Sequence, residues 1–121
     1  MFQLQVAKVP EWPNHSFSEL KLKNNIWLYG AGNLAILLKD LLKEKCNRVP
    51  RGVADTYSTG EWNGYFLITP DELMKKVEPG DVILISSSLW VEIRQMLLEM
   101  KVTCPVYGYL TEGRDIIYRL L

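Results

Sequence analysis

The residues best suited to chemistry lie in a short segment around position 30. Gly30, Gly32 and Ala35 fit the spacing G-x-G-x-x-G/A, in which glycines let backbone N–H groups approach a phosphate without interference from a side chain. An apolar run, Ile26 to Tyr29, precedes this turn and a helical pattern follows it, so a phosphate would also meet the positive end of a helix. The pattern predicts a site for a phosphate-bearing ligand. The alternative is a strand-to-helix turn that uses glycine for its geometry alone.

Asp55 is the candidate for holding a ribose. It follows Gly32 by 23 residues and closes a weak strand, where a carboxylate accepts hydrogen bonds from ribose hydroxyls and repels a 2′-phosphate. This favours NAD or a nucleotide sugar over NADP, a preference that Arg48 or Arg51 would weaken if either pointed to the ribose. The alternative role for Asp55 is to cap the turn at Thr56.

Three consecutive serines, Ser86 to Ser88, follow the clearest strand of the sequence. They are expected at the carboxyl edge of the sheet, where ligands bind in open α/β sheets. Their hydroxyls suit phosphate, ribose or sugar, although Ser87 or Ser88 would equally serve to cap a helix that begins at Leu89. The predicted cofactor-binding residues are Gly30, Ala31, Gly32, Asn33, Leu34, Asp55, Thr56, Ser86, Ser87 and Ser88.

No catalytic residue and no metal ligand is predicted. His15 is the only histidine, in a proline-flanked arm, and Cys46 and Cys104 lack the spacing of a metal site or a Cys–His nucleophile. No tyrosine has a lysine four residues later, as short-chain dehydrogenase chemistry needs, and no glycine-rich loop ends in Lys-Ser or Lys-Thr. The sequence therefore favours binding over catalysis.

The elements that must position these residues alternate between strand and helix. Pro10 and Pro13 follow an alternating pattern at Phe2, Leu4 and Val6, and a capping box at Ser16 and Glu19 predicts one helical turn. Strands are predicted at 26–29, 51–55, 65–68, 82–85 and 105–109. Four helices are predicted: one after Gly32, one from a capping box at Thr69 and Glu72 to Pro79-Gly80, one at 89–100 and one at 111–121. Three of these helices have an apolar side, formed by Leu34, Leu37, Leu38, Leu41 and Leu42 in the first, by Leu89, Ile93, Met96, Leu97 and Met100 in the third, and by Ile116, Ile117, Leu120 and Leu121 in the last. This order predicts an α/β protein: a single Rossmann-like domain of three layers with a mostly parallel sheet of about five strands.

Length and charge limit the remaining possibilities. The chain has 121 residues, with 14 basic and 14 acidic side chains and no net charge. We expect one domain at 25–121 preceded by an N-terminal arm at 1–24. A neutral chain has no electrostatic surface for nucleic acid or anionic membrane, and leaves homodimer formation unopposed by repulsion. There is no signal peptide and no long apolar segment, and two isolated cysteines suit reduced thiols, so a cytoplasmic location is expected.

Four segments carry a family resemblance: "IWLYGAGNLA", "GVAD", "GYFLITPDEL" and "DVILISSS". Over roughly 85 residues the chain resembles the small Rossmann-like domains of nucleotide-sugar and polysaccharide biosynthesis proteins, such as the N-terminal domain of bacterial sugar O-acyltransferases and the domains preceding some nucleotide-sugar epimerases and dehydratases. The resemblance implies that Gly30, Ala31, Gly32, Asn33 and Asp55 contact a nucleotide. The histidine that often follows the glycine turn in the acyltransferases is absent here, with Leu34 in that region.

The leading hypothesis is a nucleotide-binding module, for NAD or a nucleotide sugar, that acts as a sensor or as one part of a larger enzyme. The first alternative is an interaction domain that has lost the ligand, with its arm and terminal helix forming a dimer. The second is a small oxidoreductase or transferase whose catalytic residues come from a partner subunit.

Overall fold

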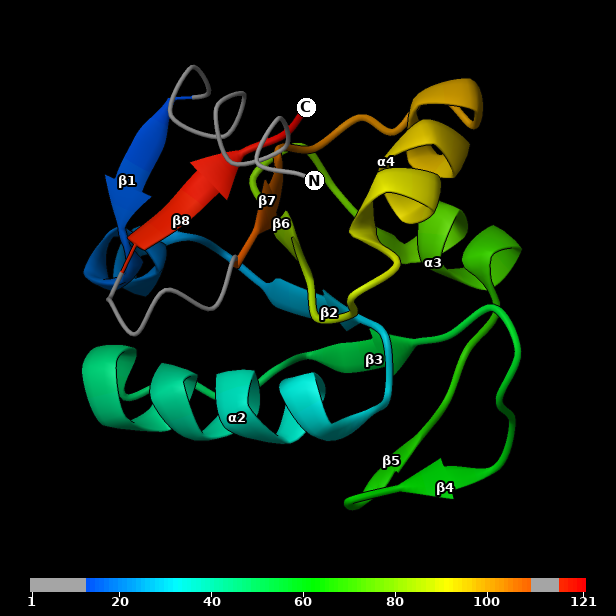
Figure 1. Ribbon diagram of the computed structural model, residues 1–121, viewed down its shortest axis with the longest axis horizontal. Coiled ribbons are helices and arrows are strands. Elements are labelled where there is room, and N and C mark those ends of the chain that lie inside the picture. Colours follow the sequence, from blue (N-terminus) through cyan, green and yellow to red (C-terminus); the bar gives the residue numbers. More distant parts are fainter. Residues whose placement is uncertain (1–12, 110–115) are drawn as a thin grey trace, which may run out of the picture.

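The computed structural model describes residues 13–109 and 116–121 (Figure 1). The strand expected at Phe2, Leu4 and Val6 lies outside these residues. The helical elements are η2 (Phe17–Leu22, a 3-10 helix), α2 (Asn33–Leu41), η3 (Leu42–Cys46, a π-helical turn that continues α2), α3 (Pro70–Lys76) and α4 (Trp90–Glu99). The strands are β1 (Asn14–Ser16), β2 (Ile26–Tyr29), β3 (Gly52–Ala54), β4 (Glu61–Trp62), β5 (Tyr65–Phe66), β6 (Val82–Ile85), β7 (Val106–Gly108) and β8 (Ile116–Arg119).

Six of the described strands form one mixed, mostly parallel sheet in the order β1-β8-β7-β6-β2-β3. Strands β3, β2, β6 and β7 run parallel, and Leu28 of β2 is in register with Val53 on one side and Leu84 on the other. Strand β8 is antiparallel to β7, and β1 is antiparallel to β8. The chain therefore has an α/β architecture, with six strands where about five were expected.

The central strands β2 and β6 are buried at every position, as the apolar runs predicted for strands covered on both faces. Alternate side chains join two separate core clusters. Leu28 packs in the cluster that contains Leu38 of α2, whereas Ile83 packs with Leu73 of α3 and Leu97 of α4. Helix α2 accordingly covers one face, and α3 and α4 cover the other (Figure 1).

Two helix starts agree with the sequence patterns. The hydroxyl of Thr69 accepts from the Glu72 N–H and the Glu72 carboxylate accepts from the Thr69 N–H, which forms the expected capping box of α3. Ser16 and Glu19 form the same arrangement at η2. Because these bonds span three residues, they form without help from distant parts of the chain.

Two predicted apolar stripes are wrong at one position each. Leu37 of α2 is 42% exposed, and Ala35, Leu38 and Leu42 form the buried side of the helix. Leu89, expected on the apolar side of α4, is 46% exposed. The buried side of α2 is therefore narrower than the predicted stripe, and it includes the small side chain of Ala35, which is fully buried.

The predicted helix at 111–121 is wrong where it can be compared. Residues 116–119 form strand β8, which pairs with both β7 and β1; positions 111–115 lie outside the described residues. Ile117 and Leu120 are buried in the two core clusters. An unpaired edge of β7 offers backbone hydrogen bonds that a local apolar pattern does not reveal, and the β-branched residues 116 and 117 suit a strand.

The predicted strand at 65–68 is divided between two roles. Tyr65 and Phe66 pair with β4 in a small antiparallel hairpin outside the main sheet (Figure 1), and Ile68 forms a single parallel bridge to Ala54 at the end of β3. The short helix α3 ends at Lys76, before the expected stop at Pro79-Gly80.

Residues 14–22 of the predicted arm contribute to the same sheet and core. Strand β1 extends the sheet through β8, and Phe17 and Leu20 of η2 are buried against the α2 side of the core. None of the helices among the described residues combines the length and the apolar character of a membrane-spanning segment.

Candidate functional site

The turn after β2 is held by backbone geometry that only glycine allows at its first position. Gly30 has a φ of +118°, and a Cβ at this residue would lie 2.7 Å from the carbonyl oxygen of Ser86. The Gly30 N–H donates to the carbonyl of Ala54 at 2.8 Å, and its own carbonyl accepts from the Ser86 hydroxyl at 2.8 Å. The glycine is therefore explained by the fold itself, because it lets the ends of β2, β3 and β6 meet.

Gly32 stands in a different environment. Its φ of −108° is open to any L-residue, and a Cβ built on it meets no heavy atom of the described residues within 4 Å. It is the N-cap of α2, and no side chain caps this helix. The first N–H groups of a helix have no intrahelical acceptor, so the start of α2 presents donors beside an open space.

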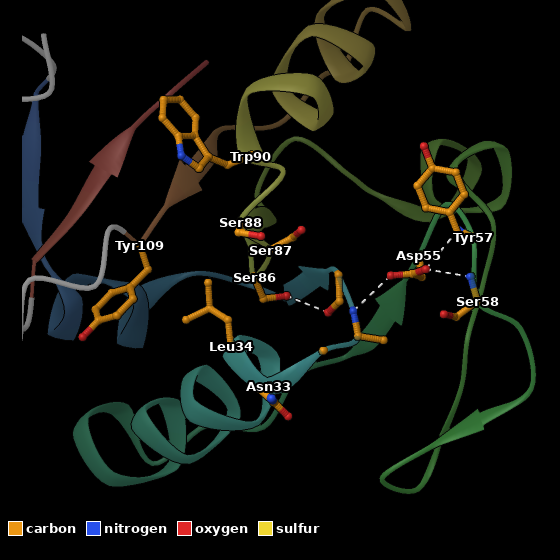
Figure 2. Close-up of a pocket in the computed structure, with 13 residues that line it drawn as sticks. Asn33, Leu34, Asp55, Tyr57, Ser58, Ser86, Ser87, Ser88, Trp90 and Tyr109 are labelled. Carbon is orange, nitrogen blue, oxygen red and sulfur yellow. Dashed lines mark hydrogen bonds between the residues drawn. The ribbon is translucent and has the colours of Figure 1, made fainter. Parts of the chain in front are cut away.

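Asp55 lies at the end of β3 and reaches this turn. Its Oδ1 accepts from the Ala31 N–H at 3.1 Å, while Oδ2 accepts from the N–H groups of Tyr57 and Ser58 at 3.0 and 2.7 Å (Figure 2). The turn-capping role that was the alternative for this residue is present. The bond to Ala31 adds a second role, which is to tie the carboxylate to the glycine turn.

The three serines have different surroundings. Ser86 is 1% exposed and its hydroxyl holds Gly30, so this serine supports the turn. The Ser87 hydroxyl accepts from the Leu89 N–H at 3.0 Å, just ahead of α4, but Leu89 is the N-cap of α4 and no side chain caps this helix, so the alternative capping role is found for neither Ser87 nor Ser88. The side chain of Ser88 lies on the rim of the pocket described next (Figure 2).

These segments enclose a pocket of about 710 Å³ at the carboxyl ends of β2, β3 and β6. Nine of the ten predicted binding residues line it; Thr56 is the exception. The sequence did not assign four further lining residues, Tyr57, Ser58, Trp90 and Tyr109, which come from three separate segments (Figure 2). Tyr57 and Ser58 could have been predicted from their position directly after Asp55, whereas Trp90 and Tyr109 are brought to one pocket only when β6 and β7 pair.

A smaller pocket of about 210 Å³ adjoins the first and shares Asp55, Tyr57 and Ser87 with it. Thr56 is found here, and its hydroxyl lies 2.6 Å from that of Tyr29. Burial raises the pKa of the Tyr29 hydroxyl, although the hydrogen bond with Thr56 opposes the shift. Tyr29 is therefore a neutral hydroxyl at ordinary pH and not a base.

Asp55 is the one charged residue among the described residues that line the larger pocket. Arg48 points elsewhere: its guanidinium donates to the carbonyls of Lys23 and Asn24, both at 2.7 Å, and so holds the segment after η2. Arg51 lines neither pocket that contains Asp55. Positive potential at the site comes from the start of α2 and not from a basic side chain.

The other reactive side chains lie away from the pocket. Cys46 and Cys104 are buried free thiols, and burial raises the pKa of both, that of Cys104 to about 11. His15 pairs with Glu19 at 3.1 Å on the surface of β1 and η2. Across residues 13–109 and 116–121, no group of three or more His, Cys, Asp or Glu side chains could hold a metal ion.

Comparison with known proteins finds no family model that matches the chain, and no significant match among curated proteins or solved structures. A function for this protein is therefore argued from the geometry of the pocket.

Proposed function

We propose that this chain is a Rossmann-like domain that binds a nucleotide, NAD or a nucleotide sugar, in the pocket in front of Gly32. The open space at Gly32 is the observation that carries the proposal. Neither the backbone conformation nor the packing of the described residues requires glycine there. A ligand phosphate close to the backbone would require it, since any side chain would fill that space.

The arrangement of strands supports the same reading. From β2 the chain continues to β3 on one side, and later returns to β6 on the other. Open α/β sheets bind ligands at such a reversal, outside the carboxyl ends of the strands. Gly30 and Ser86 follow β2 and β6 directly and both line the pocket.

The polar groups favour a phosphate on α2 with a ribose next to Asp55. The start of α2 supplies uncapped N–H donors and the positive end of the helix dipole. The Asp55 carboxylate has about four acceptor positions, of which three are taken by backbone N–H groups. This leaves room for one ribose hydroxyl, and the negative charge without a neighbouring arginine disfavours a 2′-phosphate.

The proposal is tested by thermal unfolding in the presence of NAD, NADP, UDP-sugars, coenzyme A and S-adenosylmethionine. A ligand that binds only the folded state raises the melting temperature, by an amount set by its concentration relative to Kd. We expect a shift with NAD or a UDP-sugar that exceeds the shift with NADP. No shift with any of the five at millimolar concentration would contradict nucleotide binding.

A Gly32→Asp variant locates the ligand. The carboxylate would occupy the open space and repel a phosphate, so we expect the ligand-induced shift to disappear while the unliganded protein stays folded. Thr103→Asp, which adds the same charge at an exposed residue away from both pockets, is the matched control and should keep the shift. If Gly32→Asp binds as well as the parent, the phosphate does not lie on this turn.

A further inference from the structure

The smaller pocket is placed to receive the base attached to a ribose at Asp55. Asp55, Tyr57 and Ser87 belong to the walls of both pockets, so the two cavities meet at the carboxylate proposed to hold the sugar. With the phosphate at Gly32 and the ribose at Asp55, the third part of a nucleotide, its base, extends toward the smaller pocket. The volume of about 210 Å³ is suited to a planar ring and not to a second sugar phosphate.

The walls of this pocket are suited to an aromatic ring. Ile93 and Met96 of α4, with Leu89 at its N-cap, provide an apolar side of the pocket. Tyr57, which is 82% exposed, also lines the pocket and has a ring face available for stacking. Stacking of a base on an aromatic side chain tolerates any base, so these walls explain why a base would bind but not which one.

Most polar groups of the pocket are already engaged. The hydroxyls of Tyr29 and Thr56 are within 2.6 Å of each other, and the Tyr29 hydroxyl also contacts the sulfur of Met96 at 3.7 Å. The Ser87 hydroxyl accepts from the backbone ahead of α4. They are therefore poorly placed to discriminate between bases.

Glu92 is the exception. It lies in the first turn of α4 and lines the smaller pocket, and among the described residues no side chain pairs with its carboxylate. An ionised carboxylate only accepts hydrogen bonds. It attracts the exocyclic amino group of a base, as acidic side chains do with the N4 amino group of cytosine, and repels a carbonyl oxygen at the same position.

We infer that Glu92 is a specificity-determining residue that selects a nucleobase with an exocyclic amino group, seated in the smaller pocket. This inference rests on the proposed nucleotide-binding function. Of the ligands proposed above it selects NAD, which carries adenine, over UDP-sugars, because uracil has a carbonyl oxygen where cytosine has an amino group.

The test uses two pairs of mononucleotides that differ at this group: AMP with IMP, and CMP with UMP. Titration calorimetry on the full chain gives Kd for each. We expect the amino-bearing member of at least one pair to bind about tenfold more tightly, as expected for one hydrogen bond to a charged group. In Glu92→Gln, whose side-chain amide both donates and accepts, the two members of that pair should bind within about threefold of each other.

Glu99→Gln is the matched control, because Glu99 lies on the same helix, is exposed and lines neither pocket. It should keep the parent's preference. Equal binding within both pairs, or an unchanged preference in Glu92→Gln, would overturn the role of Glu92 while leaving nucleotide binding intact. If none of the four nucleotides binds to the folded parent and the ligand panel is also negative, the proposed function fails together with this inference.

Discussion

The carboxylate of Asp55 and the backbone N–H of Ala31 are joined by a hydrogen bond of 3.1 Å, across 24 residues of sequence. This bond connects the end of β3 to the turn after β2, and the same carboxylate also caps the backbone at Tyr57 and Ser58. Asp55 thus organises the pocket whether or not a ligand is bound. Its effect on binding and its effect on stability therefore have to be measured separately.

Asp55→Ala should weaken both properties. The substitution leaves three backbone N–H groups without their acceptor, which we expect to lower the free energy of unfolding by about 1–3 kcal/mol. Urea denaturation measures this change in stability. Ligand titration, at a temperature where the variant is folded, measures the loss of binding. Asp40→Ala, at an exposed position of α2, should change neither by more than about 0.5 kcal/mol. A parent-like stability for Asp55→Ala would show that the caps contribute nothing.

Gly30→Ala and Gly32→Ala should differ strongly in their effect on stability. Gly30→Ala forces a side chain into a φ of +118° and brings its Cβ within 2.7 Å of the Ser86 carbonyl oxygen, so we expect a loss of about 2–4 kcal/mol from strain and displacement of β6. Gly32→Ala meets open space and should cost only about 1 kcal/mol, the loss that alanine causes at a helix N-cap, yet weaken nucleotide binding. Equal destabilisation by the two variants would contradict this account of the turn.

The buried side chain of Asp81 supports the other end of the sheet. It is 1% exposed and accepts from Trp27 Nε1, Asn25 Nδ2 and the Glu78 N–H at 3.0–3.1 Å. Asp81→Ala leaves the indole N–H of Trp27 buried without a partner, which should reduce the free energy of unfolding by about 3 kcal/mol. Adding Trp27→Phe removes that unpaired donor. A double-mutant cycle in urea should show the two substitutions to be coupled, and strict additivity would refute the contact.

The buried thiol of Cys104 should make the protein less stable in alkaline solution. Its thiol has a folded pKa of about 11, raised above the ordinary value of a cysteine chiefly by burial. The folded state holds this proton more tightly than the unfolded chain does. The contribution of the thiol to the free energy of unfolding is therefore complete below pH 9 and is lost as pH rises from 9 toward 11. Urea denaturation across this interval should show a steeper decline for the parent than for Cys104→Ala. Parallel declines would mean that the thiol does not titrate differently on unfolding.

Local features of the fold were accessible from the sequence. The capping boxes at Ser16 and Thr69 depend on contacts within a few residues. The strands β2 and β6 are continuous apolar runs, for which a position covered on both faces of the sheet is the favourable environment. The glycine turn belongs to the same class, since a positive φ at Gly30 is a property of one residue. The structure also brings nine of the ten residues assigned from sequence to one pocket.

By itself the sequence determined the elements that are stabilised by interactions between residues close in sequence, together with the polar residues at the ends of the parallel strands. Only the tertiary structure decided that residues 116–119 form a strand on the free edge of β7, that Trp90 and Tyr109 line the same pocket as the glycine turn, and that Asp81 meets Trp27 across 54 residues. The physical reason is that each of these contacts depends on strand pairing. Two distant segments must pair each other's backbone N–H and C=O groups, and the residues of one segment do not identify the segment with which it pairs.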